Sequence, residues 1–142
     1  MSSQPKSGLP PSDAAPPIRV TAHDLARLDA LLDTPAYRQH PGAAALQREL
    51  DRADVLPADH PANDVVGMHA RVECIDEHDG SRRTLTLVYP HEADVDAGRV
   101  SILAPVGTAL LGLAIGQRID WPAANGRTLR LRVLSVTAPG EV

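Results

Sequence analysis

Apolar residues recur at helical spacing in the first patterned part of the chain. Four leucines share one helical face: Leu25, Leu28, Leu31 and Leu32. Thr21, with Asp24 three residues later, is a capping signature that places the start of this helix at Thr21. The pattern breaks at Thr34-Pro35, and residues 37–42 are predicted to form a loop.

A second helix is predicted after this loop and ends before Pro57. Its apolar face consists of Leu46, Leu50 and Ala53. Two amphipathic helices of about a dozen residues, joined by a short loop, predict an antiparallel helical hairpin, a short coiled coil. Helices of this length are not stable alone in water, so we expect them to pack on each other and on the next domain.

From Val65 the period of the pattern changes to two, which is typical of a half-buried strand. The apolar face of this strand would hold Val66, Met68, Ala70, Val72 and Cys74. Cys74 is therefore expected to be a small buried hydrophobe rather than a reactive thiol.

Turn signals separate the strands that follow. Asp79-Gly80 is typical of a hairpin turn, and the strand after it ends at Pro90. One face of that strand carries Leu85, Leu87 and Tyr89. Residues 91–98 read as an acidic loop, and short strands are predicted over residues 100–103 and 118–121.

The last predicted strand, residues 129–136, changes phase along its length. Its apolar positions shift between Val133 and Leu134, which a β-bulge or burial on both faces would explain. Together the strands predict a small antiparallel sheet.

The most apolar run of the chain extends from Ala104 to Gly116. Pro105 suits the first turn of a helix because its φ is preset and its missing N–H has no partner there. Gly112 and Gly116 can adopt left-handed backbone and end the helix. We predict a short helix, too short to span a membrane, that caps the sheet and closes the core. The fold class is therefore α+β, a short N-terminal helical hairpin followed by a sheet domain with one short helix.

Composition shifts divide the chain into four segments. Residues 1–17 are rich in Pro, Ser and Ala without periodicity and are expected to be a disordered tail. The hairpin occupies residues 18–56, and residues 57–64 form a polar, proline-marked linker. The sheet domain takes residues 65–142.

The overall charge and the single cysteine narrow the function classes. The chain has 142 residues and a formal net charge of −4, which is not the basic footprint of a sequence-specific nucleic-acid-binding protein. Cys74 has no second cysteine with which to pair, which fits a reducing cytoplasm. No continuous apolar segment at the N-terminus predicts a signal peptide or membrane anchor. We expect a cytoplasmic protein.

The side chains that could carry chemistry form no catalytic motif. The six histidines show no zinc-ligand spacing, and neither a nucleophile elbow nor a phosphate loop is present. Asp29 and Asp33 lie at i and i+4 and could hold a divalent cation, although such pairs are more often a solvated face. The sequence therefore predicts no catalytic residue, no cofactor and no metal.

Basic residues gather in the C-terminal part of the chain. Arg127, Arg130 and Arg132, with Arg82 and Arg83 earlier, could meet an acidic partner surface, or they could be ordinary solubilising charges.

The order of these motifs resembles a known family. A helical hairpin followed by an α+β domain with a Pro- and Gly-marked helix is similar to the Gre transcript-cleavage factors, whose C-terminal domain is FKBP-like. The regulator of nucleoside diphosphate kinase family, a Gre-like group with a short hairpin, is a nearer match. The residues that carry it are Leu31-Leu32, Pro35-Ala36-Tyr37, Asp64-Val65-Val66, Met68, Arg71-Val72, Leu87-Val88-Tyr89-Pro90, Ala104-Pro105-Val106-Gly107, Ala109-Leu110-Leu111-Gly112-Leu113 and Gly116.

The resemblance implies a partner and a surface. Gre-like proteins bind bacterial RNA polymerase, with the FKBP-like domain at the rim of the secondary channel and the hairpin directed inward. The loop of this chain that corresponds to the polymerase-facing loop of Gre-like proteins consists of Ala104, Pro105, Val106 and Gly107. If this loop is not the contact, the strand with Arg127, Arg130 and Arg132 is the next polymerase-binding candidate. The residues at the hairpin tip are Asp29, Asp33, Tyr37 and Arg38. We expect a monomeric, non-enzymatic regulator that competes with Gre factors and affects nucleoside diphosphate kinase levels.

Two departures from the Gre pattern bear on catalysis. Gre factors have a longer hairpin with an acidic pair at its tip, whereas residues 34–42 of this chain contain no carboxylate and Asp33 stands alone at their edge. Prolyl isomerases of the FKBP type line their pocket with aromatic residues, whereas this domain has only Tyr89 and Trp121. The alternatives are a residual transcript-cleavage factor, an isomerase, or an adaptor unrelated to polymerase.

Overall fold

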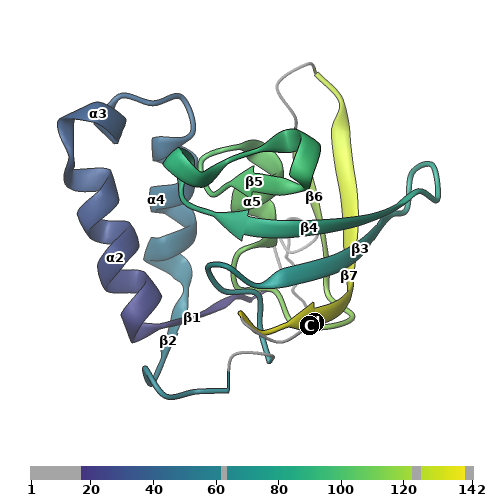
Figure 1. Ribbon diagram of the computed structural model, residues 1–142, viewed down its shortest axis with the longest axis horizontal. Helices are drawn as coiled ribbons and strands as arrows, with labels where there is room; N and C mark the ends of the chain where they lie inside the picture. The colour runs from purple at the N-terminus through teal and green to yellow at the C-terminus, as the bar shows by residue number, and fades with distance from the viewer. Residues whose placement is uncertain (1–16, 62–63, 123–125, 140–142) are drawn as a thin grey trace, which may run out of the picture.

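The computed structural model describes residues 17–61, 64–122 and 126–139. A helical hairpin lies beside a twisted sheet, and the turn between the third and fourth strands projects from the opposite end (Figure 1). The tail expected over residues 1–17 lies outside the described residues apart from Pro17.

The hairpin consists of α2 (Ala22–Asp33), a short helix α3 (Pro35–Arg38) and α4 (Ala43–Arg52). The predicted cap is confirmed, because the Thr21 hydroxyl oxygen accepts a hydrogen bond from the Asp24 N–H at 3.2 Å. The prediction that residues 37–42 form a loop was wrong at its start. Pro35 begins a new helical turn that extends through Arg38, since proline is well suited to the first position of a helix.

A two-stranded parallel sheet at the base of the hairpin was not predicted. Strand β1 (Arg19–Thr21) enters α2, strand β2 (Asp54–Leu56) leaves α4, and the two strands pair in parallel. Strands of three residues carry too little alternation to be recognised in sequence, and their pairing joins residues far apart in the chain.

The main sheet has five strands in the order β5-β4-β3-β7-β6. Their bounds are β3 (Arg71–Asp76), β4 (Arg82–Val88), β5 (Arg99–Ser101), β6 (Arg118–Pro122) and β7 (Thr128–Thr137). The prediction of a purely antiparallel sheet was wrong, because β4 and β5 pair in parallel. Between them the chain folds back through two short 3-10 turns, Pro90–Glu92 and Val95–Ala97, in the loop predicted to be irregular.

The first predicted strand begins later than the pattern indicated. Residues 65–70 keep the alternation of buried and less buried side chains, but the regular strand starts at Arg71. His69 interrupts the extended backbone with a φ of 68°, a left-handed conformation that is uncommon for a residue other than glycine.

The phase shift predicted in the last strand is a β-bulge. Glu73 faces Ser135 and the next residue, Cys74, faces Val133, so Leu134 is the extra residue on β7. The bulge lets Val133 and Val136 both point into the core.

Helix α5 (Pro105–Leu110) forms where the apolar run predicted it. Gly112 and Gly116 follow it with φ of 80° and 89°, which confirms the left-handed positions. Ala109, Leu110 and Leu113 are buried, so this segment closes the core. No helix among the described residues is long and apolar enough to cross a membrane.

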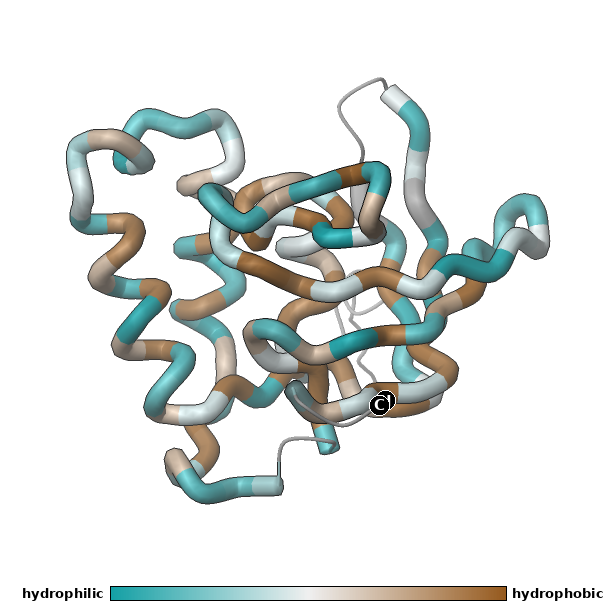
Figure 2. The backbone as a smooth tube through the Cα atoms, viewed as in Figure 1, coloured by the Kyte–Doolittle hydropathy of each residue, from teal (hydrophilic) through white to brown (hydrophobic). Residues whose placement is uncertain are grey.

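One hydrophobic core joins the hairpin to the sheet. Leu28 and Leu46 of the hairpin are completely buried in the same cluster as Val72, Leu87 and Leu110. Figure 2 shows that β4 becomes hydrophobic toward the end beside the hairpin, whereas the β3–β4 turn is hydrophilic. The expectation that the hairpin packs on the following segment is therefore confirmed.

Candidate functional site

The segment from Ala104 to Gly107 begins α5 and is held rigidly. The Leu103 N–H donates to the Ser101 hydroxyl at 3.0 Å, and the Thr108 hydroxyl donates to the Ile102 carbonyl at 2.7 Å. Ala104, Pro105 and Val106 are half-buried, and Val106 also packs against the core. The accessible part of this segment is therefore small, and fixed in shape.

Gly107 serves internal packing. It is buried, and a Cβ added to it would collide with the carbonyl oxygen of Ser101. The absence of a side chain at this polymerase-binding candidate is therefore explained by the close approach between α5 and β5.

The hairpin tip brings together two of its four predicted residues. The Arg38 guanidinium donates to the main-chain carbonyl of Asp33 at 2.8 Å, and both side chains are exposed. Tyr37 instead packs against the core, and Asp29 lies exposed on α2. Among the described residues, no three His, Cys, Asp or Glu side chains gather where they could hold a metal ion.

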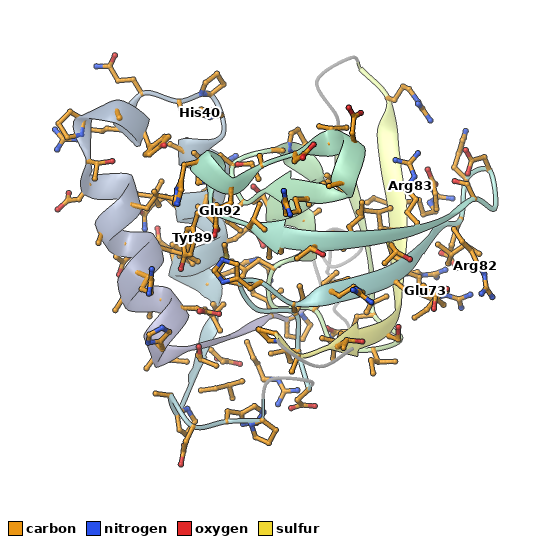
Figure 3. All side chains as sticks on the ribbon, in the orientation of Figure 1. His40, Glu73, Arg82, Arg83, Tyr89 and Glu92 are labelled. Atoms are coloured by element: carbon orange, nitrogen blue, oxygen red, sulfur yellow. The ribbon has the colours of Figure 1, made fainter. Side chains whose placement is uncertain are left out.

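The tip lies against the loop that begins α5. A Cβ on Gly42, at the start of α4, would collide with the Leu103 carbonyl oxygen, so the two backbones touch. The His40 Nδ1 atom accepts a hydrogen bond from the Gly42 N–H at 2.9 Å. His40 is labelled in Figure 3 and marks the position of this contact. The end of the hairpin loop is therefore in contact with the residue that precedes the Ala104–Val106 segment.

A seam of polar contacts joins α2 to the sheet domain. The Asp24 carboxylate accepts the Met68 N–H at 3.0 Å, and the Arg27 guanidinium lies 5.3 Å from the centre of the Tyr89 ring. Burial raises the pKa of the Tyr89 hydroxyl. A cleft of about 270 Å³ opens beside these residues, between the start of α2 and the irregular segment around His69. The seam was missed in the sequence, since its partners lie tens of residues apart.

The seam continues into the turn after β4. The Glu92 carboxylate oxygen lies 2.8 Å from His69 Nε2 and accepts the Tyr89 N–H at 3.1 Å. The hydrogen bond from His69, with that from the Tyr89 backbone, holds the pKa of Glu92 below its usual value. Figure 3 shows Tyr89 and Glu92 beside the hairpin. Most histidines lie exposed, as expected, but His69 and His60 each meet a carboxylate, Glu92 and Asp64 respectively.

The candidate arginines of the sheet do not stand alone. Arg130 forms an ion pair with Asp120 at 3.1 Å, and Arg132 pairs with Glu77 at 3.4 Å. Arg127 is exposed in the turn before β7. The structure thus separates these arginines from the Ala104–Gly107 segment and places each of the two strand arginines beside a carboxylate.

Cys74 is inaccessible. It is completely buried, and burial raises the pKa of its thiol. This confirms the expectation of a small buried hydrophobe.

Both halves of the chain match families of known proteins. Residues 61–138 match the family described as "Transcription elongation factor, GreA/GreB, C-term", and residues 16–56 match "Rnk N-terminus". The Escherichia coli K12 protein "Regulator of nucleoside diphosphate kinase" is 41% identical over 121 residues, which cover 85% of this chain and 89% of that protein. The "Transcription elongation factor GreA" of Rhodospirillum rubrum is 36% identical over 81 residues, 57% of this chain and 52% of its own length.

A solved structure agrees with these matches. The structure titled "Prokaryotic transcription elongation factor GreA/GreB from Nitrosomonas europaea" aligns with a TM-score of 0.67 at 42% identity. The alignment covers 86% of this chain and 98% of that one. The similarity therefore includes the hairpin as well as the sheet.

Proposed function

The chain belongs to the Gre-factor-like family of regulators of nucleoside diphosphate kinase, as its sequence motifs indicated, and we propose that it is a non-enzymatic transcription regulator that binds bacterial RNA polymerase. In this proposal it docks near the secondary channel, competes there with Gre-type factors, and affects nucleoside diphosphate kinase levels through transcription. The relatives that support the proposal are named as regulators or transcription factors, not as enzymes.

The observation that carries the proposal is the fixed position of the hairpin. Leu28 and Leu46 are buried in the core shared with the sheet, and Gly42 touches the Leu103 carbonyl near the tip. Helix α2, with 12 residues, is about 18 Å long at 1.5 Å per residue. A hairpin this short and packed to its tip can occupy a rim, but it cannot extend far into a channel without opening the core.

The chemistry of the tip supports a role without catalysis. Asp33 is the carboxylate at the edge of the tip, and its main-chain carbonyl already holds the Arg38 guanidinium nearby. A metal ion that stabilises developing charge needs several oxygen ligands in a fixed geometry. One exposed carboxylate beside a guanidinium does not supply the several oxygen ligands that such a site needs.

We place the polymerase contact on the surface formed by the tip and the Ala104–Val106 segment. In this arrangement residues 18–56 and 65–142 act as two units joined by residues 57–64. Their shared core fixes the position of the tip relative to the Ala104–Val106 segment, so little conformational entropy is lost on binding.

The test is binding to purified RNA polymerase core with and without a Gre factor. The full chain carries an affinity tag, and polymerase retained on it is quantified as a Gre factor is added. We expect saturable retention that the Gre factor displaces. If no polymerase is retained, the proposed function is wrong; if polymerase is retained but not displaced, the competition is wrong.

A second measurement addresses catalysis. Stalled elongation complexes are incubated with Mg²⁺ and this protein, with a Gre factor as the positive control. We predict that the transcript keeps its length. Mg²⁺-dependent shortening that is lost in Asp33→Asn would identify a residual cleavage factor instead.

A further inference from the structure

The outer face of the five-stranded sheet carries arginines from every strand. The strand register places them on one side, away from the core: Arg71, Arg82, Arg99, Arg118, Arg130 and Arg132. We call this set the arginine face. Arg82 and Arg132 both oppose Ile75, and Arg132 in turn opposes Arg118, so these three form one row across the sheet.

Four carboxylates lie among these arginines: Glu73, Glu77, Asp94 and Asp120. The face therefore has a net charge of +2, in a chain whose formal net charge is −4. The acidic residues outnumber the basic ones elsewhere, so the charge of the molecule is unevenly distributed, and the sheet face is its positive side.

Three of the arginines are more exposed than the carboxylates that they pair with. The Arg118 and Arg132 side chains are 67% and 45% exposed and their shared partner Glu77 only 19%, while Arg82 is 68% exposed and Glu73 40%. In the pairs Arg99–Asp94 and Arg130–Asp120 the two side chains are about equally exposed. A guanidinium has five N–H donors, so an arginine paired once or twice can still bind a second carboxylate.

A groove crosses the end of this face remote from the hairpin. It has a volume of about 480 Å³ and is lined by His78, Asp120, Arg127, Thr128 and Arg130. Figure 3 shows Arg82 and Glu73 at this same end of the sheet, far from the tip labelled by His40. A volume of about 480 Å³ is enough to hold a side chain of a partner beside these arginines.

We propose that the arginine face docks an acidic segment of the partner protein, which under the proposed function is RNA polymerase. Positive charge on the outermost layer attracts carboxylates, and guanidinium groups already held by ion pairs lose little entropy when they bind. This surface is distinct from the one formed by the tip and the Ala104–Val106 segment.

The interleaved carboxylates favour a protein over a nucleic acid. A nucleic-acid backbone presents a continuous row of negative charge, which Glu73, Glu77 and Asp120 would repel. A protein segment carries separate carboxylates that can align with the arginines and avoid those positions.

The test uses fluorescently labelled full-length protein titrated with RNA polymerase core at 50 and 200 mM salt. The variant combines Arg82→Glu with Arg130→Glu. The control is the single substitution Arg48→Glu, at an exposed position of α4. We expect the double variant to bind at least about tenfold more weakly at low salt and to lose most of its salt dependence. The control should stay within about twofold, and circular dichroism should show all three proteins folded.

The outcomes separate this inference from the proposed function. If the wild-type protein does not bind polymerase, both are wrong. If the wild type and the double variant bind polymerase equally, the inference about the arginine face is wrong and the proposed function stands. Binding of a labelled single-stranded RNA as tightly as polymerase, lost in the double variant, would assign the face to a nucleic acid and overturn the inference.

Discussion

The two faces of the five-stranded sheet are built on opposite principles. The inner face is mostly apolar and shares one hydrophobic core with α5 and the hairpin, and Val72, Leu87 and Leu110 in this core are completely inaccessible. The outer face carries several ion pairs, in which the arginine side chains remain largely exposed. Burial of apolar area stabilises a fold strongly, whereas exposed ion pairs contribute little. Stability therefore resides on the inner face, and the outer face is available for recognition.

The first prediction tests the inner face at a completely buried side chain. Leu110→Ala should lower the free energy of unfolding by about 2–5 kcal/mol, because the cavity left behind cannot be filled without moving α5. Urea unfolding followed by circular dichroism measures it. Ile115→Ala, at a side chain 56% exposed, is the control and should change stability by less than about 0.5 kcal/mol. Equal losses at both positions would show that α5 does not close the core.

The second prediction concerns the contact between the hairpin and α5. Gly42→Ala forces a Cβ against the Leu103 carbonyl and should cost about 1–3 kcal/mol, and alanine brings no compensating gain because Gly42 is the N-cap of α4. Gly67→Ala is the comparison, because its new Cβ would meet only the Asp24 carboxylate at 2.9 Å. That side chain can turn aside at the cost of its hydrogen bond from the Met68 N–H, so Gly67→Ala should cost less than Gly42→Ala. A Gly42→Ala protein as stable as the wild type would mean that the tip is not fixed on the sheet domain.

Much of this fold was predictable because burial leaves a local trace. The alternation from Val66 to Cys74 identified the inner face, although His69 breaks the strand that the alternation suggested. The phase shift at Leu134 gave the bulge. The parallel pairing of β4 with β5 left no such trace, because strand direction depends on how the chain returns and not on the strand itself.

The candidate surfaces were less accessible to sequence reasoning. Arg82, Arg83, Arg130 and Arg132 were singled out in the sequence. Only the register of four strands brings Arg118 into this set and places Arg83, which opposes the buried Cys74, on the other face of the sheet. Sequence alone also cannot tell why residue 107 is a glycine, because a glycine that admits a partner and one that admits a neighbouring strand look the same in sequence. Which residues share a surface, and what a glycine packs against, depends on contacts between residues that are distant in the sequence.

The third prediction asks whether recognition also extends to the edge of the inner face. Pro105→Glu places a negative charge in the first turn of α5, where the helix dipole tolerates it, so the melting temperature should stay nearly unchanged. If the Ala104–Val106 segment is the polymerase contact, affinity should fall by about tenfold, since the carboxylate would be buried against the partner. A parallel melt and polymerase titration measures both. Unchanged affinity in a folded protein would leave the arginine face as the remaining candidate.

The smallest effect is expected from an exposed pair at the seam, where His69 meets Glu92. The pKa of Glu92 is held below its usual value of 4.5 in the folded protein, first by the hydrogen bond from His69. A depressed carboxyl pKa contributes stability that is present above about pH 4.5 and is lost as pH falls through the folded pKa. Glu92→Gln should therefore melt slightly below the wild type at pH 7, and the difference should shrink as pH falls below 4.5 and through the folded pKa.

Thermal melts between pH 3 and 7 measure this difference. Asp96→Asn removes one negative charge from the same loop, at an exposed side chain for which the described residues provide no hydrogen bond or ion pair, and it serves as the control. Its melting temperature should follow that of the wild type at every pH. A Glu92→Gln protein that also follows the wild type would show that this pair adds nothing to the buried face, because two side chains this exposed are largely screened by water.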